Sequence, residues 1–97
     1  MKSEHLYIVS YDIRNDKRWK RIYKTLKGYG AWLQLSVFQC RLEKMSMIRL
    51  EAELSDLLNH DEDHLLIMDI GPAENIKPKI KSYGKPFEPV TREAIIV

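Results

Sequence analysis

A single carboxylate, Asp12, separates an apolar stretch of the chain from a strongly basic one. Residues 5 to 11 are mostly apolar and aromatic, whereas residues 14 to 27 contain seven Lys and Arg side chains against one acid, Asp16. A carboxylate is a suitable ligand for a divalent cation, and the cationic stretch beside it would attract a phosphate backbone. Taken alone, Asp12 and its neighbours favour capping of a turn, and metal-assisted chemistry on a polyanion is the alternative.

Asp12 cannot form such a site alone. Magnesium requires octahedral oxygen coordination and normally takes one or two carboxylates together with waters and phosphate oxygens. A twofold axis near Asp12 would bring two copies of this residue together. We therefore expect one Mg²⁺ or Mn²⁺ ion to be shared between the two Asp12 carboxylates of a dimer.

The basic stretch predicts a helix from Lys17 to Tyr29. Asn15 or Asp16 is the expected N-cap, and Gly28 and Gly30 are stop signals. Apolar residues recur at helical spacing on one side, and the cations occupy the other. An ordinary solvated face would look similar, but so many cations without compensating acids favour phosphate-backbone binding. The residues expected to bind nucleic acid are Arg14, Lys17, Arg18, Lys20, Arg21 and Lys24.

Other reactive side chains have simpler interpretations. His60 and His64 flank three acids in a predicted turn, where a solvated loop is favoured over a metal site. Trp19 and Trp32 are expected to pack in the core or at an interface rather than to stack on bases. Cys40 is expected to be buried and unreactive. The chain contains no glycine-rich phosphate loop.

The order of elements predicts an α+β, ferredoxin-like βαββαβ fold within a single domain, residues 1–97. The second helix is expected to start at Ser46, with a Met45–Leu50 hydrophobic staple before it. The remaining elements are a strand over 5–12, one bent or two short strands over 31–42, a strand over 64–70, a helical turn near 73–76 and an extra C-terminal strand over 88–97.

Two helices on one face of a sheet leave the other face without a cover. A chain of 97 residues has little left to provide one, so the pattern predicts a homodimer that forms through the sheet. The lone cysteine favours a reducing, cytoplasmic location, and no apolar stretch of 18 residues predicts a membrane span. Residues 1 to 42 carry nine basic side chains and three acids, which favours a polyanionic partner.

Three motifs resemble the CRISPR-associated Cas-two family. They are Tyr11-Asp12-Ile13 after an apolar strand, Asp16-Lys17-Arg18 at the start of a basic helix, and Gln34-Leu35-Ser36-Val37-Phe38 after that helix. The resemblance implies a ferredoxin-like homodimer that acts in spacer acquisition beside the Cas-one integrase. It also implies metal-dependent endonuclease activity on RNA or double-stranded DNA.

The resemblance also implies roles for individual residues. Asp12 matches the family's metal-binding aspartate, with Tyr11 beside it, and Ser36 and Phe38 lie in the second motif. Arg18 and Arg21 lie in the helix from which members supply phosphate-facing arginines. Trp19 and Trp32 occupy positions where members often have Arg. A non-catalytic structural adapter and a related ferredoxin-like ribonuclease toxin are the alternative functions.

Overall fold

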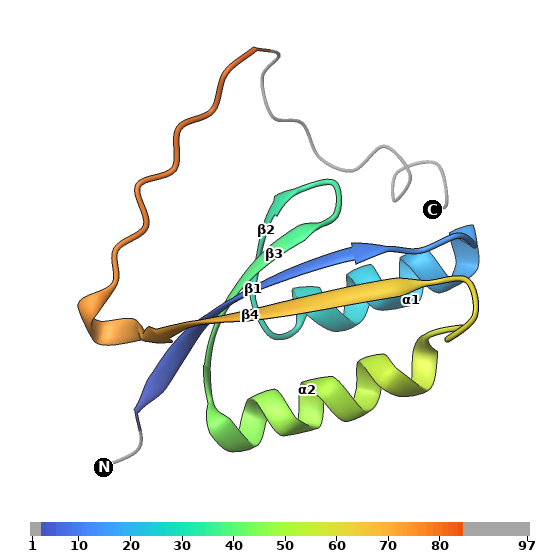
Figure 1. The fold of residues 1–97 in the computed structure, drawn as a ribbon, viewed down its shortest axis with the longest axis horizontal. Helices are drawn as coiled ribbons and strands as arrows, with labels where there is room; N and C mark the ends of the chain where they lie inside the picture. The colour runs from blue at the N-terminus through green and yellow to red at the C-terminus, as the bar shows by residue number, and fades with distance from the viewer. Residues whose placement is uncertain (1–2, 85–97) are drawn as a thin grey trace.

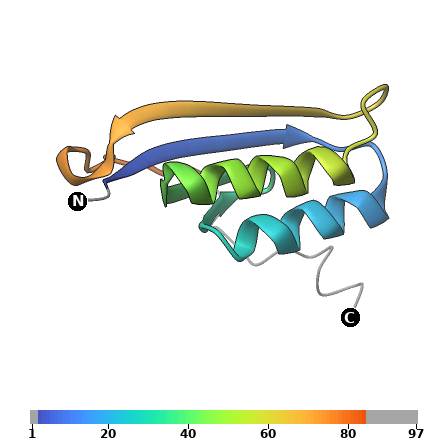
Figure 2. The ribbon, with the colours of Figure 1, turned by 90° about the horizontal axis from the view of Figure 1, so that it is seen from below.

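A four-stranded antiparallel sheet carries two long helices on one of its faces (Figures 1 and 2). This computed structural model describes residues 3–84. Its elements are β1 (Glu4–Asp12), α1 (Asp16–Lys27), β2 (Ala31–Gln34), β3 (Val37–Glu43), α2 (Lys44–Leu57), β4 (His64–Pro72) and a 3-10 turn, η1 (Ala73–Asn75). The strand order β2-β3-β1-β4 confirms the predicted ferredoxin-like fold. The strand predicted over 88–97 lies outside the described residues.

The strand β1 is the central element of the sheet. It pairs antiparallel with β3 on one side and with β4 on the other. Because side chains alternate along a strand, Tyr7, Val9 and Tyr11 all point toward the helices, and all three are buried. Ile8 and Ser10 lie on the opposite face and are half-buried. One strand therefore contributes both to the core and to the helix-free face.

The core lies between the sheet and the helices. Its members from the helices are Trp19, Ile22, Tyr23, Leu26, Met47, Leu50 and Leu54. Trp19 stacks on Tyr23 with ring centroids 5.3 Å apart and is 2% exposed, which confirms its predicted packing role. Cys40 is fully buried, and burial raises the pKa of its thiol to about 11, so at neutral pH this cysteine is the unreactive thiol that the sequence predicted.

The second helix begins earlier than the sequence predicted. It starts at Lys44, directly after β3, and its N-cap Glu43 makes no side-chain capping hydrogen bond. Met45 is 60% exposed, so the predicted hydrophobic staple with Leu50 is wrong. By contrast, of the two alternatives for residues 31–42 the structure has the two strands, β2 and β3, with the turn at Leu35 and Ser36.

Within residues 3–84, no helix or strand covers the face of the sheet away from the two long helices (Figure 2). On β4, Leu66 is 46% exposed, Met68 is 41% exposed and Ile70 is 46% exposed. These three residues alternate along the strand, so they share one face. We call them the β4 apolar row. Among residues 3–84, neither helix is long and apolar enough to cross a membrane.

Gly30 sets how closely the end of α1 approaches β3. Its amide donates to the Leu26 carbonyl at 2.9 Å, and a Cβ added at this position would lie 2.5 Å from Cys40 Sγ and from the Gln39 carbonyl oxygen. A methyl group does not fit there without a shift of the backbone. The absence of a side chain at this position therefore allows the close packing.

We predict that Gly30→Ala destabilises the protein by about 1–3 kcal/mol, the usual cost of overpacking. Urea unfolding followed by circular dichroism measures the effect. Gly28→Ala is the matched control, because Gly28 has a right-handed helical conformation and an added Cβ there meets only ordinary contacts. Equal stability of the two variants would contradict the close approach at Gly30.

Candidate functional site

Asp12 is the last residue of β1 and lies at the edge of the helix-free face. Tyr11 before it points into the core, so the alternation of side chains places Asp12 on the other face. Its side chain is 67% exposed, and its nearest ion-pair partner is Arg14, with 3.9 Å between Arg14 Nη2 and Asp12 Oδ2. This long, exposed contact leaves the carboxylate available to a ligand.

The three residues predicted to support Asp12 hold the end of its strand. The Tyr11 amide donates to the Ser36 carbonyl at 3.1 Å, and the Tyr11 hydroxyl donates to the Leu35 carbonyl at 3.3 Å. Phe38 is fully buried, and its ring centroid lies 6.2 Å from that of Tyr11. Contacts made by Tyr11, Ser36 and Phe38 therefore help to position the end of β1.

Arg18 is bound by acids of the chain itself. Its Nε donates to Asp63 Oδ2 at 2.7 Å, and its Nη2 donates to Asp63 Oδ1 at 3.1 Å and to Glu62 Oε1 at 2.9 Å. This bidentate arrangement uses the fork of the guanidinium. The geometry therefore favours a structural role for Arg18, and its predicted contact with phosphate stays a prediction.

Asp63 is the residue that the sequence reasoning missed. It was expected to lie in a solvated turn, but its side chain is 0% exposed. Besides Arg18, its oxygens accept hydrogen bonds from the Arg14 amide at 2.9 Å and from the Asn59 amide at 2.9 Å. Hydrogen bonds from the Arg18 guanidinium hold the pKa of Asp63 well below its usual range, although burial acts in the opposite direction.

These contacts join the two loops beside Asp12. The β1–α1 loop supplies Arg14, the first turn of α1 supplies Arg18, and the α2–β4 loop supplies Asn59 and Asp63. Asn15 caps α1 as predicted, because its side chain accepts a hydrogen bond from the Arg18 amide at 3.0 Å. Asp63 lies 45 residues further along the chain than Arg18, so the spacing of residues in the sequence does not reveal this pair.

The remaining predicted nucleic-acid-binding residues form a stripe on the outer side of α1. Lys17, Arg21 and Lys24 are exposed, and Lys20 is half-exposed. Because α1 packs beneath the sheet (Figure 2), this stripe lies in the helix layer, whereas Asp12 faces away from the helices. Arg14 is the predicted binding residue that the structure places beside Asp12.

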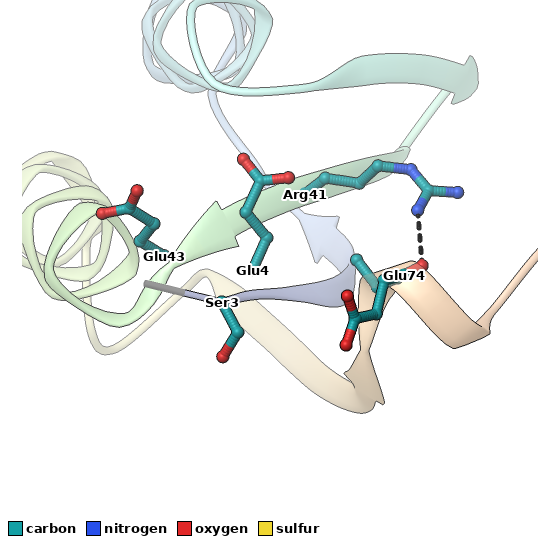
Figure 3. A pocket seen from close by; sticks show the side chains of 6 residues that line it. Ser3, Glu4, Arg41, Glu43 and Glu74 are labelled. Carbon is teal, nitrogen blue, oxygen red and sulfur yellow. Dashed lines mark hydrogen bonds between the residues drawn. The ribbon is translucent and has the colours of Figure 1, made fainter. Parts of the chain in front are cut away.

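A cavity of about 400 Å³ lies near the other end of β1 and is lined by Ser3, Glu4, Arg41, Glu43, Ala73 and Glu74 (Figure 3). Arg41 Nη1 donates to the Ala73 carbonyl at 3.1 Å. The one guanidinium in the cavity is thus bound to η1, and the carboxylates around it disfavour a phosphate ligand. The chemistry of the residues places the candidate site at Asp12 rather than here.

Whether the site at Asp12 suits a divalent cation depends on how many ligand atoms the protein places around the ion. Within residues 3–84 no group of three or more His, Cys, Asp or Glu side chains is arranged to hold a metal ion. Asp12 offers an exposed carboxylate oxygen, which is the donor that Mg²⁺ and Mn²⁺ accept, but one chain supplies too few of them. The donors of one chain, among residues 3–84, therefore do not by themselves complete a site for such a cation.

The fold and site define a small ferredoxin-like protein with an exposed carboxylate at the end of its first strand. The family model described as CRISPR associated protein Cas2 matches residues 5–77. The chain belongs to this family, and the resemblance drawn from the three motifs is confirmed.

Individual relatives cover almost the whole chain. It is 62% identical over 94 residues to the CRISPR-associated endoribonuclease Cas2 of Geobacter sulfurreducens, covering 97% of this chain and 99% of that protein. It is 47% identical over 95 residues to the CRISPR-associated endoribonuclease Cas2 1 of Rhodospirillum rubrum, covering 98% of this chain and 93% of that protein. The crystal structure of a hypothetical protein, TT1823 from Thermus thermophilus, aligns with a TM-score of 0.73 and 32% identity over 88% of this chain and 99% of that one.

We predict that Asp63→Asn lowers the thermal unfolding midpoint at pH 7, because the variant loses the carboxylate that accepts four hydrogen bonds. The folded-state pKa of Asp63 is depressed, so its contribution is complete above the unfolded pKa of about 3.9 and is lost as the pH falls toward the folded value. The difference in unfolding midpoint between Asp63→Asn and the wild type should therefore become smaller below about pH 4.

Asp61→Asn is the matched control, because Asp61 is an exposed acid of the same turn. This variant should keep a thermal unfolding midpoint close to that of the wild type at pH 7 and at pH 3. An equal loss of stability at pH 7 and pH 3 in Asp63→Asn would contradict the assignment.

Proposed function

We propose that this protein acts in CRISPR adaptation as a homodimer that binds duplex nucleic acid beside the Cas-one integrase. In this proposal the dimer also cleaves phosphodiester bonds of RNA or double-stranded DNA in the presence of Mg²⁺ or Mn²⁺. The observation that carries it is the exposed Asp12 carboxylate on the uncovered face of a chain from the Cas2 family. The endoribonuclease names of its relatives support the activity. The lone cysteine, Cys40, agrees with a cytoplasmic location.

The uncovered face supports the homodimer. The β4 apolar row, with about half of each side chain exposed, is a surface that a monomer would leave in water. A second copy that packs its own row against this one would bury both, and a twofold axis makes such a surface self-complementary. Because Asp12 lies on the same face, the two carboxylates would then belong to one interface.

The protein's own residues supply position and charge. A divalent cation bound there supplies Lewis acidity and a water of lowered pKa. Asp12 would hold the cation, and the contacts of Tyr11 with Leu35 and Ser36 restrict how far the strand end moves. Arg14, whose amide is fixed by Asp63, places a positive charge near the phosphate that would occupy the site.

A non-catalytic adapter is the second candidate function. The basic stripe of α1 and Asp12 belong to opposite sides of the sheet, which supports binding of a duplex that does not depend on chemistry at Asp12. Contacts from Lys17, Arg21 and Lys24 to phosphates would be independent of sequence. This arrangement suits a spacer protein that holds DNA for a partner.

We predict that Asp12→Asn abolishes metal-dependent cleavage, with a loss of about 100-fold or more, because the cation loses its charged ligand. Labelled RNA and duplex DNA incubated with Mg²⁺ or Mn²⁺ and separated on denaturing gels measure this loss. Gel-shift affinity for duplex DNA should remain, since the α1 stripe is unchanged. Cleavage that persists in Asp12→Asn would refute the nuclease, and a wild type that binds duplex but never cleaves would favour the adapter.

We predict that Met68→Lys converts the dimer to a monomer, because it places a charge in the middle of the β4 apolar row. Sedimentation velocity at several protein concentrations measures the change. Met45→Lys is the matched control, since Met45 is also exposed but lies on α2, away from that face. A dimer that survives Met68→Lys and dissociates in Met45→Lys would contradict the sheet-to-sheet arrangement.

A further inference from the structure

We propose that His64 is a second protein ligand of the divalent cation at Asp12, so that the site prefers a transition-metal ion such as Mn²⁺ to Mg²⁺. This inference rests on the part of the proposed function in which Asp12 binds a cation. It adds a residue that the sequence placed in a solvated turn, and it assigns the site a metal preference.

The pairing of two strands brings His64 to Asp12. Asp12 is the last residue of β1, His64 is the first residue of β4, and the two are direct partners in the antiparallel register. Directly opposed residues in such a pair point to the same face, with Cβ atoms about 4.5–5.5 Å apart. The preceding pair, Tyr11 and Leu65, faces the helices, so Asp12 and His64 share the uncovered face. A carboxylate and an imidazole at this spacing can reach one ion.

His64 differs from the other two histidines of the described chain in what its ring contacts. His5 Nδ1 lies 2.8 Å from Asp69 Oδ1, and His60 Nε2 lies 3.0 Å from the Ser55 carbonyl oxygen. For His64, which is exposed, no hydrogen bond or ion pair of the ring occurs within residues 3–84. Both ring nitrogens are therefore available to a ligand from solvent.

The mixed donor set determines which cation is preferred. Mg²⁺ takes oxygen ligands and gives up its waters reluctantly, whereas imidazole nitrogen suits first-row transition metals. One chain supplies one oxygen donor and one nitrogen donor, and a twofold pair doubles both. Two Asp12 and two His64 would give a transition-metal ion four protein ligands, while the imidazoles would add little to the binding of Mg²⁺.

Mn²⁺ alone is the probe for this assignment. Titration of the full-length protein with Mn²⁺, followed by the electron paramagnetic resonance signal of the free ion, gives the affinity. Electron spin echo modulation from ¹⁴N reports whether an imidazole is bound directly, and displacement of Mn²⁺ by Mg²⁺ gives the second affinity. We expect His64→Gln and His64→Ala to weaken Mn²⁺ binding about tenfold or more, the lower end of the loss seen even for outer-shell partners, and to remove the ¹⁴N modulation.

The matched control is His60→Gln, which changes another exposed imidazole of the same turn and should leave the Mn²⁺ affinity and the ¹⁴N modulation unchanged. Asp12→Asn should weaken binding of both metals, whereas the His64 variants should leave the Mg²⁺ affinity close to that of the wild type. Sedimentation and circular dichroism confirm that each variant is folded and keeps the oligomeric state of the wild type.

The outcomes separate this inference from the proposed function. If Mn²⁺ binding and cleavage need Asp12 but the His64 variants keep the affinity and the ¹⁴N modulation, the inference is overturned and the nuclease proposal stands. If Mn²⁺ binding needs both residues but no substrate is cleaved, the metal site is supported and the nuclease proposal fails. If the wild type binds no Mn²⁺, the assignment of His64 is overturned together with that of Asp12.

Discussion

Among residues 3–84, two helices cover only one face of the four-stranded sheet (Figure 2). The covered face buries one parity of β1 in the core. The other parity lies on the uncovered face beside the β4 apolar row. The hydrophobic effect favours removal of that row from water, and the same face carries Asp12 and His64. The proposed dimer and the proposed metal site are thus consequences of one unfilled layer.

The position of Asp12 depends on contacts made by its neighbours rather than by Asp12 itself. Tyr11 is anchored to the β2–β3 turn, and the Arg14 amide is anchored to Asp63. Asp63 is fully enclosed, so its charge must be matched, and Arg18 provides the match through two hydrogen bonds. Because its neighbours are anchored in this way, Asp12 is held at a defined place while its carboxylate stays available to a ligand.

The basic stripe of α1 and the Asp12 carboxylate lie on different sides of the sheet, and this separation affects how the proposed nucleic-acid binding and cleavage are related. A stripe on the outer side of α1 can hold a phosphate backbone whether or not a cation occupies the other face. The proposed binding and the proposed cleavage are therefore separable.

From the sequence alone follow the element order, an N-cap for α1 at Asn15 or Asp16 and the exposed cations of α1, because these depend on local propensity and periodicity. The sequence also carried the family motifs around Asp12. It did not determine the partners of Asp63 and His64, which are Arg18 and Asp12 from segments about fifty residues away. Strand register decides one of those pairs, and the contact of the α2–β4 loop with the first turn of α1 decides the other. Register is a property of the folded sheet, where a shift of one residue would move His64 to the opposite face.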